Sequence, residues 1–208
     1  MRDRIKGVAT ELLIKYGYRG LRFKDIAEQL GTTRANIHYH FGTKKNLIEE
    51  VIQDYVEGTV VEVKAIWTAR NLTYVERVRR MMEFNRQRYS RFNPAGKDGR
   101  PWSIISRMRL ESDMLSKKSK ETLRSFSQTA EGYVNAALAE AIARGEISQD
   151  APARDIVVQI VAIIDSAGSI TSDAGSFDRL EHLYTAYLRV LTHAYGGENA
   201  PALVAVAE

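Results

Sequence analysis

The stretch from Phe23 to Leu47 constrains the fold of this 208-residue chain most strongly, because it encodes two short helices and the start of a third. Residues 25–30 carry apolar side chains three and four positions apart, which is the spacing of a helix with one buried face. Gly31 suits the left-handed position that ends a helix, and Thr33 is a good cap for a second helix from Arg34 to Phe41. Two helices joined by a short turn that contains glycine form a helix-turn-helix.

The second helix of this motif has a narrow apolar side and a broad polar one. Ile37 and Phe41, four residues apart, face inward and leave mainly hydrogen-bonding and aromatic side chains on the remaining surface. A helix of this kind presents its first turns to base edges in the major groove, where Arg favours guanine and Asn favours adenine. The candidate DNA-binding residues are Arg22, Lys24, Thr33, Arg34, Asn36, His38, Tyr39, His40 and Lys44.

Two lysines begin the next helix. Gly42 ends the preceding helix, Thr43 caps the new one, and Lys44 and Lys45 occupy its first turn. Cations at a helix N-terminus oppose the helix dipole, at a cost of roughly a few tenths of a kcal/mol. A phosphate bound at this terminus would offset that cost, because backbone N–H groups, dipole and ammonium groups would all point at it.

Residues 1–52 resemble the DNA-binding domain of the TetR family of bacterial transcriptional regulators. The residues that carry the resemblance are Ala9, Leu13, Gly17, Gly20, Asp25-Ile26-Ala27, Gly31, Tyr39-His40-Phe41, Lys44 and Leu47. The resemblance implies an all-α protein whose last two long helices pair with those of a second subunit in a four-helix bundle. It also implies a second domain whose sequence varies between members, so that it indicates no particular ligand.

Two residues depart from the family pattern. Arg22 stands where the family usually has a Thr that caps the second helix, so that cap is either lost or replaced by Asp25. His38 stands where a Tyr commonly contacts the DNA backbone, which makes that contact doubtful and potentially pH dependent.

The positive charge is concentrated at the amino-terminal end. Residues 1–50 contain ten Lys or Arg and six Asp or Glu, whereas residues 51–208 contain twenty of each, so the formal net charge of +4 lies in the first segment. This distribution predicts a polyanionic partner for that segment. The chain has no cysteine, its first helix is charged throughout, and its longest apolar run, 156–164, is too short for a membrane span of roughly 20 residues. We therefore expect a cytoplasmic protein that has no membrane partner.

Helical periodicity continues to the end of the chain and predicts an all-α fold of about nine helices, with a helix-turn-helix domain at 1–50 and an effector-binding and dimerisation domain at 51–208. The first helix should end at Gly17 and bury Tyr16, and the fourth should cross the domain boundary without a linker. The charged residues between Trp102 and Leu115 should form a solvated face, and the tail after Gly197 should be frayed. The later helices are predicted at 74–92, 102–115, 119–144, 151–169 and 178–195.

An effector pocket is predicted among the helices of the second domain. Asn85 interrupts an apolar stripe, and a pocket is typically apolar with a few polar groups. The alternative is an ordinary core in which a neighbouring backbone group satisfies the Asn85 amide. The candidate effector-binding residues are Trp67, Met82, Asn85, Tyr89, Trp102, Met108, Phe126 and Tyr133.

The last two helices carry apolar residues over most of their circumference, which is typical of an obligate homodimer interface. The alternative is complete burial within one chain. The candidate interface residues are Ile160, Ile164, Leu180, Tyr184, Tyr187 and Leu191.

The sequence contains none of the common catalytic motifs, and the spacing of its four histidines does not suit a metal site. We therefore predict no enzyme activity, no metal and no cofactor. The function predicted is a homodimeric repressor that binds a double-stranded DNA operator and is released by an unidentified small-molecule effector. The alternative is an effector-independent DNA-binding or protein-docking module whose carboxy-terminal half only dimerises.

Overall fold

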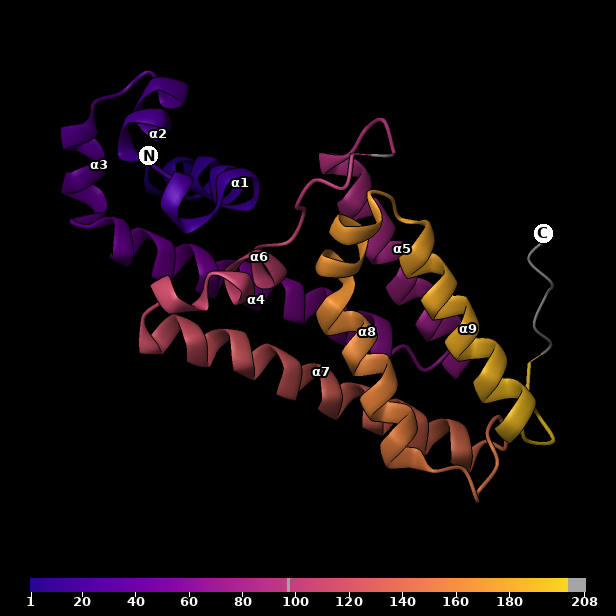
Figure 1. Cartoon of the computed structure of the whole chain (residues 1–208). Coiled ribbons are helices and arrows are strands. Elements are labelled where there is room, and N and C mark those ends of the chain that lie inside the picture. Colours follow the sequence, from indigo (N-terminus) through magenta and orange to yellow (C-terminus); the bar gives the residue numbers. More distant parts are fainter. Residues whose placement is uncertain (97, 202–208) are drawn as a thin grey trace.

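The computed structural model describes residues 1–96 and 98–201, and helices dominate this part of the chain (Figure 1). The predicted all-α fold is confirmed, with nine α-helices and one 3-10 helix in the described residues. They are α1 (Arg2–Gly20), α2 (Phe23–Leu30), α3 (Arg34–Phe41), α4 (Lys44–Trp67), α5 (Tyr74–Phe92), α6 (Ile104–Leu110), η1 (Ser112–Met114), α7 (Lys117–Ala143), α8 (Ala153–Ala174) and α9 (Asp178–Tyr195).

The helices form two groups that share α4 (Figure 1). Helices α1 to α3 pack around the first turns of α4, where Leu47, Ile48 and Val51 are buried. The rest of α4 leaves this group and packs along α7, while α5, α8 and α9 form the opposite end of the molecule. No linker separates the two groups, because one continuous helix belongs to both.

The predicted bounds are wrong for one helix that matters for the site. In place of a single helix, the region 102–115 contains the short helix α6, which Ser103 caps, and then η1. The first helix is interrupted at Gly17 as predicted, because the backbone angles there are non-helical, and one further helical segment runs to Gly20. Tyr16, predicted to be buried, is 58% exposed.

The segment after α9 is tied to the turn that follows α7. The backbone N–H of Asn199 donates to the carbonyl of Gly145 at 2.9 Å, and its side-chain amide donates to the carbonyl of Arg144 at 2.9 Å. The prediction of a frayed tail is therefore wrong for residues 198–201. The rest of that predicted tail, 202–208, lies outside the described residues.

Helix α8 is the most apolar helix in the described part of the chain. It has 22 residues, and its most apolar 18-residue window has a mean hydropathy of 1.4, which is enough in length and composition to cross a bilayer. Instead it packs against α6, α7 and α9, so it is a core helix. Only 39% of its most apolar window is buried within the chain, which leaves part of its apolar surface uncovered.

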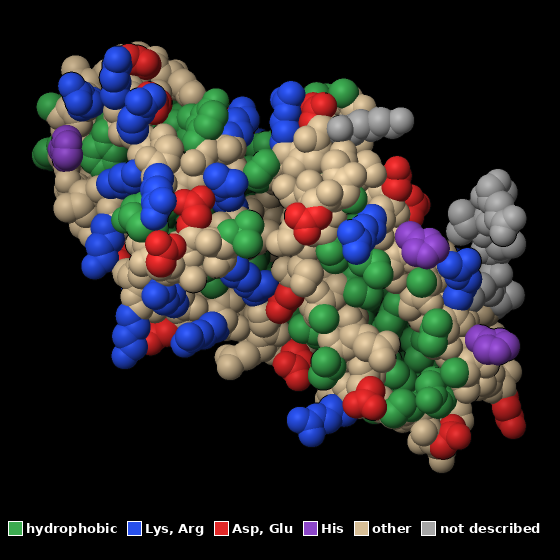
Figure 2. All heavy atoms as spheres, viewed as in Figure 1, with side chains coloured by type: hydrophobic (Ala, Val, Ile, Leu, Met, Phe, Trp, Pro, Cys, Tyr) green, Lys and Arg blue, Asp and Glu red, His purple; other side chains and the backbone are tan. Residues whose placement is uncertain are grey.

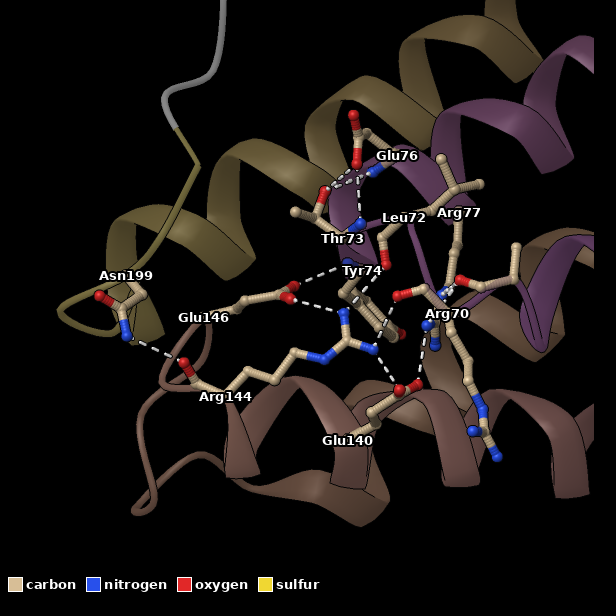
Figure 3. Close-up of polar contacts among 11 residues, drawn as sticks. Arg70, Leu72, Thr73, Tyr74, Glu76, Arg77, Glu140, Arg144, Glu146 and Asn199 are labelled. Atoms are coloured by element: carbon tan, nitrogen blue, oxygen red, sulfur yellow. Dashed lines mark hydrogen bonds and ion pairs between the residues drawn. The ribbon is translucent and has the colours of Figure 1, made fainter.

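Ion pairs fix the turn between α4 and α5 to the end of α7 (Figure 3). The side chain of Arg77 is only 1% exposed, and its Nη2 lies 2.9 Å from the carbonyl oxygen of Ala69 and 2.7 Å from Oε2 of Glu140. Arg144 also pairs with Glu140 and donates to the carbonyl of Leu72 at 3.3 Å. The carboxy-terminal end of α4 is thereby anchored to α7.

The start of α5 is held by two carboxylates in the same network (Figure 3). Thr73 and Glu76 form a reciprocal capping box, and Glu146 accepts the backbone N–H of Tyr74 at 2.8 Å. The hydrogen bond from the Thr73 backbone is the main cause that lowers the pKa of Glu76 below its ordinary value. Similarly, the hydrogen bond from Arg77 lowers the pKa of Glu140.

We predict that Glu140→Gln destabilises the protein at neutral pH and weakens its acid sensitivity. A carboxyl group whose pKa is lower in the folded state stabilises the fold above its unfolded pKa, and this stabilisation is lost as pH falls through the folded pKa. The substitution leaves the buried Arg77 charge without its partner, but Glu140 is itself 37% exposed. The free energy of unfolding in urea should therefore fall by about 1–2 kcal/mol at pH 7.

The deficit should shrink as pH is lowered below 4.5, where the wild-type carboxylate also becomes protonated. Glu131→Gln, at an exposed position on the same helix, is the matched control and should leave the acid profile unchanged. A Glu140→Gln deficit that stays constant from pH 7 to pH 3 would contradict the proposed role of the ion pair.

Candidate functional site

The α2-turn-α3 unit has the geometry of a helix-turn-helix. Gly31 ends α2 in the left-handed conformation, with φ of 61°, and the Thr33 hydroxyl caps α3 by accepting the Asn36 backbone N–H at 3.2 Å. Ile37 and Phe41 are 0% and 4% exposed, so they hold α3 against the core as predicted. The opposite side of α3 is left facing solvent.

The outer face of α3 carries an aromatic side chain that the fold does not use. Tyr39 is 84% exposed, and its ring meets the edge of the neighbouring His40 ring at a centroid distance of 5.4 Å. Arg34 is also exposed and forms no ion pair with the described residues. A large exposed aromatic residue and an unpaired cation on one short helix are typical of a surface that binds another molecule.

Other predicted DNA-contacting residues on α3 are engaged within the motif. The Asn36 amide donates to the Thr32 hydroxyl at 2.9 Å, so this donor is not directed to solvent. Nδ1 of His38 lies 2.9 Å from the carbonyl oxygen of Gly42, and the ring packs edgewise on Phe23. His40 is partly buried. Of the five predicted contacts that lie within α3, Arg34 and Tyr39 are therefore the two whose side chains are exposed and have no hydrogen-bond or ion-pair partner among the described residues.

The two cations at the start of α2 are exposed but paired. Arg22 occupies the cap position of α2 without a side-chain cap bond, so the cap is lost. Asp25 does not replace it; its carboxylate instead accepts two hydrogen bonds from Arg22, at 2.9 and 3.2 Å. Lys24 lies 3.5 Å from Glu28 on the same helix. Both cations remain within reach of an external anion.

The two lysines at the start of α4 point in different directions. Nζ of Lys44 lies 3.4 Å from the carbonyl oxygen of Arg19, at the end of α1, and 5.0 Å from the centre of the Tyr18 ring. Burial is the main cause that lowers the Lys44 pKa. Lys45 is exposed. Lys44 therefore also joins α4 to α1, and Lys45, the second lysine of the predicted phosphate site, is the one that is exposed.

A glutamate at the end of α6 inserts into a kink of α1. Gly17 has φ of 71° and ψ of −173°, and the backbone N–H that follows, that of Tyr18, donates to Oε2 of Glu111 at 2.9 Å. The other Glu111 oxygen lies 3.0 Å from Nε of Arg107. A Cβ atom at Gly17 would lie 1.9 Å from Glu111, so only glycine leaves room for this contact. The prediction that Glu111 belongs to a solvated face is wrong.

The predicted effector residues are mostly core. Only Asn85, Trp102 and Phe126 line a common cavity, whose volume is about 20 Å³, roughly the space for one water molecule. The Asn85 amide donates to the hydroxyl of Tyr184 at 2.9 Å, so a side chain rather than the expected backbone group satisfies it. The others do not line the cavity: Trp67, Tyr89 and Met108 are buried, and Met82 and Tyr133 are partly buried.

A larger cleft lies between the α6–η1 segment and α7, with one residue from α8. Its volume is about 490 Å³. Sequence reasoning missed it because its polar residues look like an ordinary solvated surface. The lining residues are Arg109, Ser112, Leu115, Lys120, Leu123, Arg124, Ser127 and Asp165.

The six predicted dimer-interface residues lie in the core of a single chain. All are 7% exposed or less, so they cannot contact a second chain and the prediction for these residues is wrong. They are Ile160, Ile164, Leu180, Tyr184, Tyr187 and Leu191. These residues form the inner apolar face of α8 and α9. The outer face also carries apolar residues, including Val158 and Val190, which are 53% and 65% exposed. Figure 2 shows hydrophobic side chains gathered over α8 and α9 and Lys and Arg side chains over the α1–α4 end.

Comparisons with known proteins place these features in a family. The model of bacterial regulatory proteins of the tetR family matches residues 5–51. Over 52 residues the chain is 40% identical to the HTH-type transcriptional regulator QacR of Staphylococcus aureus, covering 25% of this chain and 28% of QacR. Over 64 residues it is 31% identical to IcaR of S. aureus, the negative regulator of the biofilm operon icaADBC, covering 29% and 34% of the two chains.

Solved structures extend the likeness to the rest of the fold. A TetR-family regulator from Agrobacterium tumefaciens gives a TM-score of 0.79 at 19% identity, covering 91% of this chain and 96% of that one. A TetR regulator from Chloroflexus aurantiacus gives 0.76 at 23% identity, covering 94% and 96%. Residues 5–51 thus match the DNA-binding region of the tetR family, and the chain shares its fold with solved TetR-family structures. Sequence likeness to the curated relatives covers about a third of their length or less, whereas the TetR-family fold extends through α9.

Within this TetR-family fold, no group of three or more His, Asp or Glu side chains in the described residues is arranged to hold a metal ion. His38 and His40 lie on α3, and His182 and His193 are exposed on α9. The exposed surface of α3, the outer face of α8 and α9, and the cleft between α6–η1 and α7 are the features from which a function is proposed below.

We predict that Gly17→Ala destabilises the protein whereas Gly7→Ala, in the same helix, stabilises it. Alanine at Gly17 must adopt a left-handed φ, at a cost of about 1–2 kcal/mol, and displace Glu111. Gly7 has helical angles and open space around it, so alanine there should add about 0.5–1 kcal/mol. Urea unfolding measures both; equal effects would show that the Glu111 contact contributes nothing.

Proposed function

We propose that this protein is a cytoplasmic, homodimeric transcriptional repressor that binds a double-stranded DNA operator and is released by a small molecule, and that it is not an enzyme. The observation that carries the proposal is the exposed surface of α3, where Tyr39 is 84% exposed and Arg34, in the first turn, is exposed and has no ion-pair partner among the described residues. This face lies in the segment that holds the formal net charge of +4. Neutralisation of phosphates supplies much of the affinity of a protein for DNA.

In the proposed complex, α3 lies in the major groove. Arg34, in its first turn, would donate to guanine, and Tyr39 would contact the backbone or a base edge. Lys45 and the free backbone N–H groups at the start of α4 would bind a phosphate, which the helix dipole favours. Asn36 would have to leave Thr32 before it could read adenine.

The experiment that tests DNA binding is selection of duplexes from a random library by the purified protein, followed by titration of the selected fragment. We expect Tyr39→Ala to weaken binding about tenfold or more without changing the free energy of unfolding. Arg34→Ala should relax the base preference at one position, whereas Lys45→Ala should weaken binding to all sequences and reduce the salt slope by about 1.

Val61→Ala, at a 64% exposed apolar position on α4, serves as the control and should change neither DNA affinity nor salt dependence. Failure to select any sequence in low salt would refute the proposed function. Equal loss of specificity in the Arg34 and Lys45 variants would refute the division of roles between base and phosphate contacts.

The proposed homodimer uses the outer face of α8 and α9. Val158 and Val190 are exposed there, and the partly buried Ile163, Leu183 and Ala186 add apolar surface on the same two helices. Covering these residues with the same helices of a second chain gives a self-complementary interface. Two copies of α3 must then lie about 34–36 Å apart to enter successive major grooves on one side of the duplex.

We predict that Val158→Glu combined with Val190→Glu converts the protein to a monomer, because each substitution buries a carboxylate in the apolar interface. Sedimentation velocity at micromolar concentration would measure the loss of mass, and DNA affinity should fall with it. Val61→Glu introduces the same charge at a 64% exposed valine of α4 and should leave the dimer intact. A wild-type protein that sediments as a monomer would exclude this arrangement.

Release by a small molecule requires a connection between the second domain and α1–α3. The α6–η1 segment supplies one, because Arg109 lines the cleft and Glu111, two residues later, binds the kinked α1. A ligand acts through such a connection only if it binds the two arrangements of the domains with unequal affinity. The structure of a putative transcriptional regulator from Saccharomonospora viridis in complex with choline, TM-score 0.72 and 22% identity, gives a precedent for a small molecule on this fold.

One observation favours the alternative of an effector-independent module. The interior cavity has a volume of only about 20 Å³, which is too small for a metabolite. The alternative predicts that no compound that raises the melting temperature of the protein also lowers its affinity for the selected DNA. A single compound that does both would exclude it.

A further inference from the structure

The cleft between α6–η1 and α7 contains cationic groups that the fold does not neutralise. Lys120 and Arg124 lie one turn apart on α7 and form no ion pair or side-chain hydrogen bond with the described residues. Three cations and one carboxylate line the cleft, so its charged side chains sum to +2. A concave surface with this charge concentrates anions.

The remaining cation of the cleft, Arg109, is already bonded within the fold. Arg109 lies 3.0 Å from Oδ1 of Asp165, and it donates to the Ser127 hydroxyl at 2.6 Å and to the Leu123 carbonyl at 3.3 Å. With its donors in use, Arg109 orders the back of the cleft rather than serving as the anion contact. That role falls to Lys120 and Arg124, with the hydroxyl of Ser112 beside them.

The cleft adjoins an apolar interior. Asp165 lines both the cleft and the small cavity of about 20 Å³, so the two hollows share this residue in their walls. Most of the cavity walls are apolar, formed by Met81, Phe84, Trp102, Ile105, Phe126, Ile164 and Ala167. Leu115 and Leu123 add apolar surface within the cleft itself. A molecule with an anionic group and an apolar body matches this sequence of surfaces.

We propose that the cleft binds an anionic amphiphile, with its carboxylate, sulfonate or phosphate group between Lys120 and Arg124 and its apolar body on Leu115 and Leu123, directed toward Asp165. This proposal names the chemical class of the effector. Its consequence for DNA binding rests on the proposed function, whereas binding of the anion to the cleft is independent of that function. The volume of about 490 Å³ lies within the range of small-molecule sites.

Occupancy of the cleft bears directly on the short segment between α6 and α7. Arg109 and Ser112 line the cleft, whereas Glu111 between them binds the backbone of Tyr18 and Asp113 lies 3.6 Å from Arg19. A ligand that shifts this segment therefore alters the contacts that hold α1. This consequence can be measured separately from binding.

The test compares two fluorescent probes on the full chain: 8-anilinonaphthalene-1-sulfonate and N-phenyl-1-naphthylamine, which has the same aromatic body without the sulfonate. We expect Lys120→Gln combined with Arg124→Gln to weaken sulfonate binding about tenfold and to leave the neutral amine unchanged. Lys117→Gln combined with Lys118→Gln removes the same charge from the first turn of α7, outside the cleft, and should leave both probes unchanged.

Equal weakening by both variant pairs would overturn the proposal, because it would show a response to net charge rather than to the cleft. Wild-type affinity of the sulfonate for the Lys120/Arg124 variant would overturn it too, as would equal affinities of the wild type for the two probes. Decanoate should displace the bound sulfonate probe more effectively than decanol; equal displacement would exclude an anion requirement.

A second arm separates this proposal from the proposed function. Saturating sulfonate probe should lower the affinity of the wild type for its selected DNA and leave that of the Lys120/Arg124 variant unchanged. Charge-dependent probe binding with no change in DNA affinity would support the anion site and refute release through it. Failure to select DNA would refute the repressor and leave the probe result to decide the anion site by itself.

Discussion

The structure depends on α4 being held firmly at both ends. Its first turns lie in the core of the helix-turn-helix unit, where Leu47 and Ile48 are buried. The turn that follows its last residue is tied to α7 through Arg77 of α5, which contacts both the Ala69 carbonyl and Glu140. Twenty-four helical residues span about 36 Å, and a helix packed along α7 for much of that length bends little. A shift of one end must therefore appear at the other, as the proposed release from DNA requires.

A second connection runs beside α4 and differs from it in kind. The α6–η1 segment is short and polar, and it contacts α1 through the Glu111 carboxylate at the Gly17 kink. One or two hydrogen bonds can exchange between arrangements far more readily than a packed helix core can. The two connections thus differ in role. The stiff helix α4 sets where α3 lies, and the weak polar contact of Glu111 with α1 can favour one position of α1–α3 over another.

The parts that could be predicted from the sequence are those determined by local interactions. The motif from Phe23 to Leu47 follows from periodicity, a left-handed glycine and hydroxyl caps, all of which act within a few residues. The face of α8 that is internal could not be predicted, because both of its faces are apolar and the choice depends on packing against α7 and α9. The insertion of Glu111 into α1 joins residues 93 positions apart, and no local pattern encodes it. The family resemblance indicated a partner for α8 and α9, but not which side of them it would cover.

The contrast between the closed interior and the open cleft has an energetic consequence for any effector. A ligand that must enter the aromatic interior would first separate Trp102 and Phe126, and its apparent affinity would be reduced by the small fraction of molecules already open. A ligand that binds Lys120 and Arg124 meets a cleft that is already formed, so this reduction does not apply to its anionic group. Its apolar body would pack on Leu115 and Leu123, beside the ion pair of Arg109 with Asp165. Arg109 lines this cleft and lies two residues from Glu111. A ligand that enters the open cleft therefore binds close to the contact between Glu111 and α1.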